Sequence, residues 1–114
     1  MKPANRRLRV LVVDDSSVQR QMLCRLLAQD PEIEIVGSAA NGAEALRAVA
    51  RLKPDIVTLD DRMPVMGGLE TAAHIMRDAP TPIVMITSAP EAGAKLTGRA
   101  FFKRSDQSWI SEEA

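Results

Sequence analysis

Acidic residues follow two short apolar runs of this chain, and they are its first candidates for chemistry. Asp14 and Asp15 come directly after the run at 8–13, and Asp60 comes directly after the run at 56–59. Short apolar runs that are rich in β-branched residues are typical of buried strands. In open α/β sheets, ligands and catalytic groups collect at the carboxyl ends of the strands. We therefore take Asp60 as the candidate reactive group.

Two further polar residues follow apolar runs in the same way. Thr87 comes after the run at 83–86, and Lys103 comes after the run at 100–102. If all these strands are parallel, their carboxyl ends meet at one edge of the sheet. The three carboxylates, the threonine and the lysine are therefore expected to share a pocket.

This set of residues predicts phosphoryl chemistry on a carboxylate. Three clustered carboxylates resist ionising together unless a cation is present. Mg²⁺ suits such a site, because it is held by one or two carboxylates together with phosphate oxygens and waters. A hydroxyl and an ammonium group would hold the remaining oxygens of a phosphoryl group that is transferred to Asp60. Taken singly, an acidic pair after a strand is more often a helix N-cap, so the prediction depends on the combination.

The elements that position these residues alternate between strand and helix patterns. Apolar runs predict strands at 8–13, 33–36, 56–59, 83–86 and 100–102. Helical spacing begins at Val18, Asn41 and Leu69, and it ends at prolines 31, 54 and 80. This alternation predicts one α/β domain over residues 1–114, with a doubly wound, five-stranded parallel sheet. After Ser88 the helical periodicity is weak, so the fourth helix is expected to be degenerate or absent and the last helix, within 106–113, to be short.

Composition excludes several other classes of protein. The chain has 114 residues with a formal net charge of zero, which argues against a nucleic-acid binder. It has neither an apolar stretch long enough to span a membrane nor an apolar leader, so neither a membrane span nor a secretory signal is expected. Cys24 is the only cysteine, which excludes an internal disulfide and fits a reducing cytoplasm.

Three stretches carry a resemblance to a known family. The runs at 10–16, 55–66 and 84–88 resemble the receiver domains of bacterial two-component response regulators. Within that family the sequence is most similar to the receivers of chemotaxis methylesterases, notably at 63–71 and 82–88. The resemblance implies a flavodoxin-like receiver fold, in which Asp60 takes a phosphoryl group from a histidine kinase or phosphotransfer protein.

The resemblance also implies a role for each site residue. The carboxylates of Asp15 and Asp60 and the main-chain carbonyl of Arg62 would ligate Mg²⁺, with Asp14 acting mainly through water. Thr87 would bond to the phosphoryl group and move on activation, and Lys103 would pair with that group.

The chain departs from the family pattern near its carboxyl end. Fewer residues separate Thr87 from Lys103 than is usual, and those missing are where the fourth helix belongs. Lys103 is followed by Arg104 where the family usually has proline, so a shift of one residue would place Arg104 in the lysine position; we favour Lys103. Gly67 stands where the family commonly has Asp or Asn.

These departures fall on the surface through which the family signals. We expect a downstream protein, or a second copy of this chain in a homodimer through the fifth-strand edge, to cover Phe101, Phe102 and Trp109. Two alternatives stay open: a phosphorylation-independent interaction module, and the receiver fragment of a longer methylesterase. Because no G-x-S-x-G nucleophile motif occurs, we expect no turnover of an external substrate beyond slow loss of the chain's own phosphoryl group.

Overall fold

A mixed sheet with helices on both faces forms the fold. The computed structural model describes residues 6–87, 99–103 and 109–112, and the side chains of residues 6–86. In chain order the elements are β1 (Leu8–Val13), α1 (Ser17–Ala28), β2 (Ile33–Ala39), α2 (Gly42–Leu52), β3 (Ile56–Asp60), α3 (Gly68–Asp78), β4 (Ile83–Thr87), β5 (Arg99–Lys103) and β6 (Trp109–Glu112). The predicted alternation is confirmed from β1 to β4.

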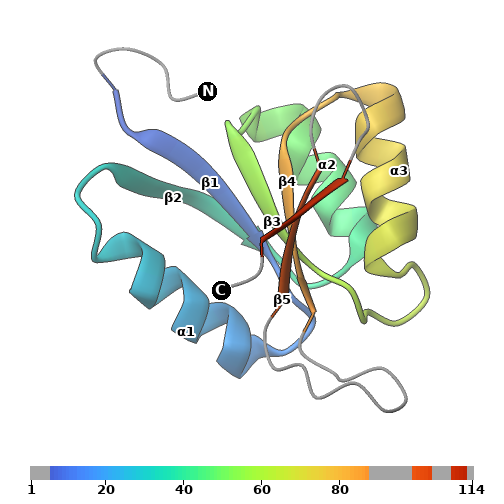
Figure 1. Ribbon diagram of the computed structural model, residues 1–114, viewed down its shortest axis with the longest axis horizontal. Coiled ribbons are helices and arrows are strands. Elements are labelled where there is room, and N and C mark those ends of the chain that lie inside the picture. Colours follow the sequence, from blue (N-terminus) through green and yellow to red (C-terminus); the bar gives the residue numbers. More distant parts are fainter. Residues whose placement is uncertain (1–5, 88–98, 104–108, 113–114) are drawn as a thin grey trace.

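The strand order in the sheet is β2-β1-β3-β4-β5-β6. The first four strands in this order are parallel to one another, as the sequence predicted. Each is joined to the next along the chain by a helix, which is the connection that parallel neighbours require. All four carboxyl ends therefore lie at one edge of the sheet (Figure 1).

Each of the first two helices begins at a residue that caps it. The Ser16 hydroxyl accepts a hydrogen bond from the Gln19 N–H at the start of α1. The Asn41 side chain accepts one from the Glu44 N–H at the start of α2. Such caps satisfy backbone donors that have no partner within the helix. The first of them also fixes the chain direction directly after Asp14 and Asp15.

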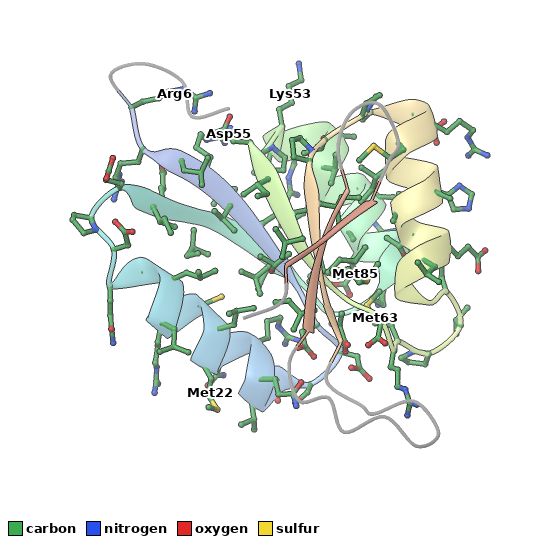
Figure 2. The ribbon with its side chains drawn as sticks, in the orientation of Figure 1. Arg6, Met22, Lys53, Asp55, Met63 and Met85 are labelled. Carbon is green, nitrogen blue, oxygen red and sulfur yellow. The ribbon has the colours of Figure 1, made fainter. Side chains whose placement is uncertain are left out.

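The main hydrophobic core lies between the sheet and the pair α2 and α3. Leu11, Leu59, Ile75 and Ile83 are among its fully buried members. Met85 of β4 is also buried there, and Met63 brings the loop after β3 into the same core (Figure 2). The loop that follows Asp60 is therefore anchored in the hydrophobic core.

Helix α1 is packed much less completely than the other two helices. None of its residues is buried, whereas α2 buries four and α3 buries five. Val18, Met22 and Leu26 are 65%, 56% and 60% exposed. They recur every fourth residue and so share one face of the helix, and Met22 points away from the sheet (Figure 2).

The prediction of a five-stranded, fully parallel sheet is wrong at its carboxyl end. β5 is antiparallel to β4, and residues 109–112 form a sixth strand, antiparallel to β5, where a short helix was predicted. Only residues 88–98 connect β4 to β5. A parallel crossover usually needs a dozen or more residues, so a connection of this length favours an antiparallel return. The expected remnant of a fourth helix lies outside the described residues.

The predicted homodimer required β5 to be an edge strand, and it is not one. It lies between β4 and β6, so the two edges of the sheet are β2 and β6. The side chains of Phe101, Phe102 and Trp109 are outside the described part of the structure. Among the described residues, no helix has both the length and the apolar character that crossing a membrane requires.

Candidate metal and phosphoryl site

Three carboxylates meet at the carboxyl edge of the two central strands. Val13 of β1 pairs with Leu59 of β3, so the residues that follow them, Asp14 and Asp60, stand side by side. One carboxylate oxygen each from Asp14, Asp15 and Asp60 lies within 4.8 Å of the others. Asp14 and Asp60 are buried, and Asp15 is exposed. The structure thus brings together the three acids that the sequence singled out.

Backbone hydrogen bonds orient the two buried carboxylates. The Ser16 N–H donates to Asp14 Oδ1 at 2.9 Å, and the Arg62 N–H donates to Asp60 Oδ1 at 3.2 Å. Each bond closes a tight loop directly after a strand end, and each uses only one carboxylate oxygen. Neither backbone bond engages the Oδ2 atom of its carboxylate.

Burial and mutual repulsion raise the pKa of the central acid. The pKa of Asp60 is raised to about 7, mainly by desolvation and then by the negative charge of Asp14, while the Arg62 N–H opposes the shift. The pKa of Asp14 is raised as well, again mainly by burial, with Arg20 acting in the opposite direction. Without a cation, these groups cannot all be ionised cheaply at neutral pH.

The donor set fits a hard divalent cation. Mg²⁺ prefers carboxylate, carbonyl and water oxygens and usually keeps several of its waters. Here an exposed carboxylate, Asp15, stands beside two buried ones whose ionisation a positive charge would favour. Asp61 adds a buried oxygen, Oδ1, that makes no hydrogen bond in the described residues. Sequence reasoning overlooked Asp61, although its place directly after the strand end could have suggested it.

A close backbone contact holds the loop that follows Asp60. The Gly68 N–H donates to the Asp61 carbonyl at 3.1 Å. A Cβ atom at position 68 would clash with the carbonyl oxygen of Asp60 and the Cα of Asp61. Only glycine permits this approach, so the first turn of α3 fixes the backbone of the reactive residue.

The structure places Thr87 and Lys103 at opposite ends of β4. Asp60 pairs with Ile86, so the backbone of Thr87 lies one residue further along the same edge, as expected. Lys103 pairs with Ile83 at the other end of β4, because β5 runs antiparallel. The expectation that Lys103 ends its strand beside the acids is therefore wrong. Arg99 is the β5 residue whose backbone pairs with Thr87.

Comparison with known proteins identifies the family. A model of the response regulator receiver domain matches residues 10–101. The chain belongs to this family. Among solved structures, this receiver is similar to the response regulator domain of Thermotoga maritima CheB, with a TM-score of 0.72 and 42% identity over 79% of this chain and 67% of that one. It is also similar to a chain of the CheX-CheY-BeF3-Mg+2 complex from Borrelia burgdorferi, with a TM-score of 0.65, 31% identity, and coverage of 75% of this chain and 68% of that one.

Two curated relatives of this receiver are much longer proteins. The protein-glutamate methylesterase/protein-glutamine glutaminase of Geobacillus kaustophilus is 51% identical over 90 residues, which is 79% of this chain and 26% of the relative. The first such protein of Xanthomonas campestris pv. campestris is 53% identical over 93 residues, 82% of this chain and 26% of the relative. This receiver therefore spans about a quarter of the length of these relatives, and the resemblance to methylesterase receivers is confirmed.

Proposed function

We propose that this receiver is a phosphoacceptor switch in which Asp60 is phosphorylated to an acyl phosphate. The observation that carries the proposal is the convergence of the Asp14, Asp15 and Asp60 oxygens within 4.8 Å at the edge of the sheet. Asp60 ends β3 within this group, and its Oδ1 already accepts a hydrogen bond from the Arg62 N–H. Its Oδ2 is therefore the nucleophile.

In the proposed step, Asp60 Oδ2 attacks the phosphorus atom of the donor and forms the new P–O bond. The bond from phosphorus to the donor's leaving group breaks, and the leaving group keeps the electron pair and takes up a proton. Asp15, Asp60 and the main-chain carbonyl of Arg62 are the proposed ligands of Mg²⁺, with Asp14 acting through water. When bound, Mg²⁺ neutralises charge that builds up on the phosphoryl oxygens. Thr87 is proposed to bond to those oxygens.

The proposed phosphoryl donor is a histidine kinase or a phosphotransfer protein, and the output is contact with another protein. The solved complex that names BeF3 and Mg+2 contains a similar chain together with CheX, which supports both the ion and a protein partner. We propose that residues 1–114 act as one domain, and that the reduced Cys24 reflects a cytoplasmic location. Nucleic-acid and membrane partners are not proposed.

A second candidate is a receiver that controls a methylesterase. It is favoured by the names of the relatives, of which this chain covers about a quarter. In that case turnover of an external substrate belongs to the remaining part of such a protein. A phosphorylation-independent interaction module is less well supported, because clustered acids are costly to keep without a cation.

The test is phosphoryl uptake from acetyl phosphate, followed by intact-mass spectrometry. We expect Mg²⁺-dependent formation of a phosphorylated protein and its complete loss in Asp60→Asn. Asp78→Asn is the matched control, because this acid is exposed on α3 and pairs with Arg77. Equal uptake by wild type and Asp60→Asn would exclude the proposal, and absence of uptake by any form would favour the phosphorylation-independent module.

A further inference from the structure

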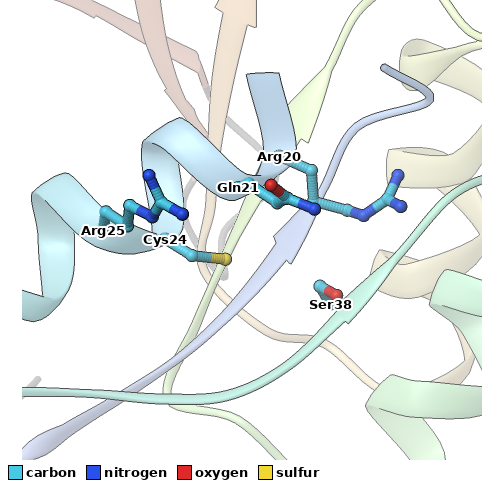
Figure 3. Close-up of a pocket in the computed structure, with 5 residues that line it drawn as sticks. All are labelled: Arg20, Gln21, Cys24, Arg25 and Ser38. Atoms are coloured by element: carbon cyan, nitrogen blue, oxygen red, sulfur yellow. The ribbon is translucent and has the colours of Figure 1, made fainter. Parts of the chain in front are cut away.

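A polar groove lies between α1 and the edge strand β2, and none of the three clustered acids lines it. Arg20, Gln21, Cys24 and Arg25 of α1 and Ser38 of β2 line a cavity of about 370 Å³. Cys24 points from the helix towards the strands, and the two guanidinium groups lie on either side of it (Figure 3). Cavities of this size are within the range that holds small molecules.

The charges that line this groove all have the same sign. None of its lining residues is acidic, and two are arginines. Helix α1 contains no acidic residue at all. The Asp14 carboxylate, which does not line the groove, interacts with the charge of Arg20, so the uncompensated positive charge of the groove is that of Arg25. The neutral lining groups include donors in Gln21 and Ser38.

The two arginines differ in how firmly they are held. Arg20 donates one N–H to the main-chain carbonyl of Asp14 at 2.7 Å, which fixes the side chain and leaves its other donors free. Arg25 makes no hydrogen bond or ion pair within the part of the chain that the structure describes. One end of the groove is thus preorganised, and the other carries a guanidinium group with no partner.

We propose that this groove binds a small organic molecule that carries an acidic group at each end. Guanidinium groups recognise carboxylates and phosphates through paired hydrogen bonds. Because the two groups stand apart with donors and a thiol between them, an extended dianion matches the groove better than a compact single anion. The proposal does not depend on phosphorylation of Asp60.

The thiol of Cys24 provides the assay, since it is the only cysteine and lies at the wall of the groove. The probe is dithiobis(nitrobenzoate), an aromatic disulfide with one carboxylate on each ring. Cys24 sulfur attacks one sulfur of the probe, the probe's S–S bond breaks, and the other half leaves as a coloured thiolate while Cys24 gives up its proton. Uncharged dithiodipyridine reacts in the same way and reports thiol access alone.

We expect Arg25→Gln to slow the reaction with the dianionic probe by roughly three- to tenfold at low ionic strength, with the neutral probe unaffected. Arg51→Gln is the matched control, because Arg51 is the basic residue in the last turn of α2 and does not line the groove. It should behave as wild type with both probes. Loss of the effect in high salt supports the electrostatic origin.

Protection of Cys24 against the neutral alkylating reagent iodoacetamide shows whether the ligand carries carboxylates or phosphates. We expect suberate, for carboxylates, or fructose bisphosphate, for phosphates, to slow alkylation of wild type and Arg51→Gln but not of Arg25→Gln. Whichever of these two compounds protects Cys24 more strongly indicates whether the ligand is a dicarboxylate or a bisphosphate. Three outcomes overturn the proposal: equal rates for all variants with the dianionic probe, slowing by Arg25→Gln with both probes, or protection by neither anion.

Discussion

At the scale of single residues, Asp60 is held in a state that a cation would change. Desolvation and the charge of Asp14 raise its pKa to about 7, so a proton and a metal ion compete for the same oxygens near neutral pH. A buried acid with two acidic neighbours gains most from a divalent ion. The same crowding that makes the ion-free pocket unfavourable therefore makes it selective for a bound cation.

This competition predicts that Mg²⁺ affinity rises with pH and reaches a plateau above pH 7. Below the pKa of Asp60, each pH unit should cost up to about tenfold in affinity, because one proton must leave for the ion to bind. The folded-state pKa is raised, so ion-free protein loses this group's contribution to stability as pH rises from about 4 towards 7. Mg²⁺ should therefore raise the melting temperature more at pH 8 than at pH 5.

Calorimetric titration with Mg²⁺ at several pH values, alongside thermal unfolding, measures both effects. Asp60→Asn removes the titrating group and should flatten both pH profiles. A wild-type affinity that does not change between pH 5 and pH 8 would contradict the assignment of Asp60 as a metal ligand.

Gly68 is the second residue whose replacement tests the pocket. We expect Gly68→Ala to destabilise the protein by about 1–3 kcal/mol and to weaken Mg²⁺ binding, because its Cβ would push against the backbone of Asp60. Gly67→Ala is the control from the same loop, since a Cβ there meets no atom closer than 3.7 Å. Urea unfolding and Mg²⁺ titration of both variants would show equal effects if the close contact were unimportant.

At the scale of elements, the sequence predicted where the strands and helices lie in the chain better than it predicted the direction of each strand in the sheet. Four apolar runs and three helical patterns located β1 to β4 and α1 to α3, because the pattern of apolar residues follows the geometry of each element. The proximity of Asp14 and Asp60 could therefore be predicted from the sequence. The apolar pattern of a strand reads the same in either direction, so nothing in residues 100–102 indicated that β5 returns antiparallel. That single reversal moved Lys103 to the far end of β4.

The sixth strand was missed for a related reason. Residues 109–112 form β6 with only Trp109 and Ile110 as apolar anchors. A run this short does not distinguish a strand from a helical turn, and the outcome depends on whether a neighbouring strand is available for pairing. Here β5 supplies that pairing through residues that lie close in the chain.

The reversal of β5 gives a prediction about the basic residue of the site. Position 99 pairs with Thr87 at the edge of the pocket, and position 103 pairs with Ile83 at the opposite end. We expect Arg99→Gln to weaken binding of beryllofluoride with Mg²⁺ by roughly tenfold, because it removes a positive charge from the position that pairs with Thr87. Lys103→Gln should change it by less than about twofold, because the backbone of position 103 lies at the end of β4 away from the pocket. Titration followed by amide chemical shifts measures both, and the reverse ranking would restore Lys103 to the role that the family resemblance implied.

At the scale of the whole molecule, the two faces of the sheet are covered unequally. α2 and α3 complete a buried core, while α1 contributes no buried residue to the other face. Val18, Met22 and Leu26 form an exposed apolar stripe that begins one turn after the acidic pocket. Large apolar side chains that are exposed along one face of a helix suit contact with another protein.

The stripe predicts that this receiver associates with itself when no other partner is present. We expect its average mass in light scattering to rise with concentration, and Met22→Lys to reduce that rise by placing a charge at the centre of the stripe. Leu69→Lys is the matched control, because Leu69 is 68% exposed but belongs to α3. If the protein stays monomeric at every concentration, the stripe does not mediate self-association and the prediction is wrong. Equal effects of the two substitutions would instead indicate general solubility, and association that persists in Met22→Lys would direct attention to the unpaired edges of β2 and β6.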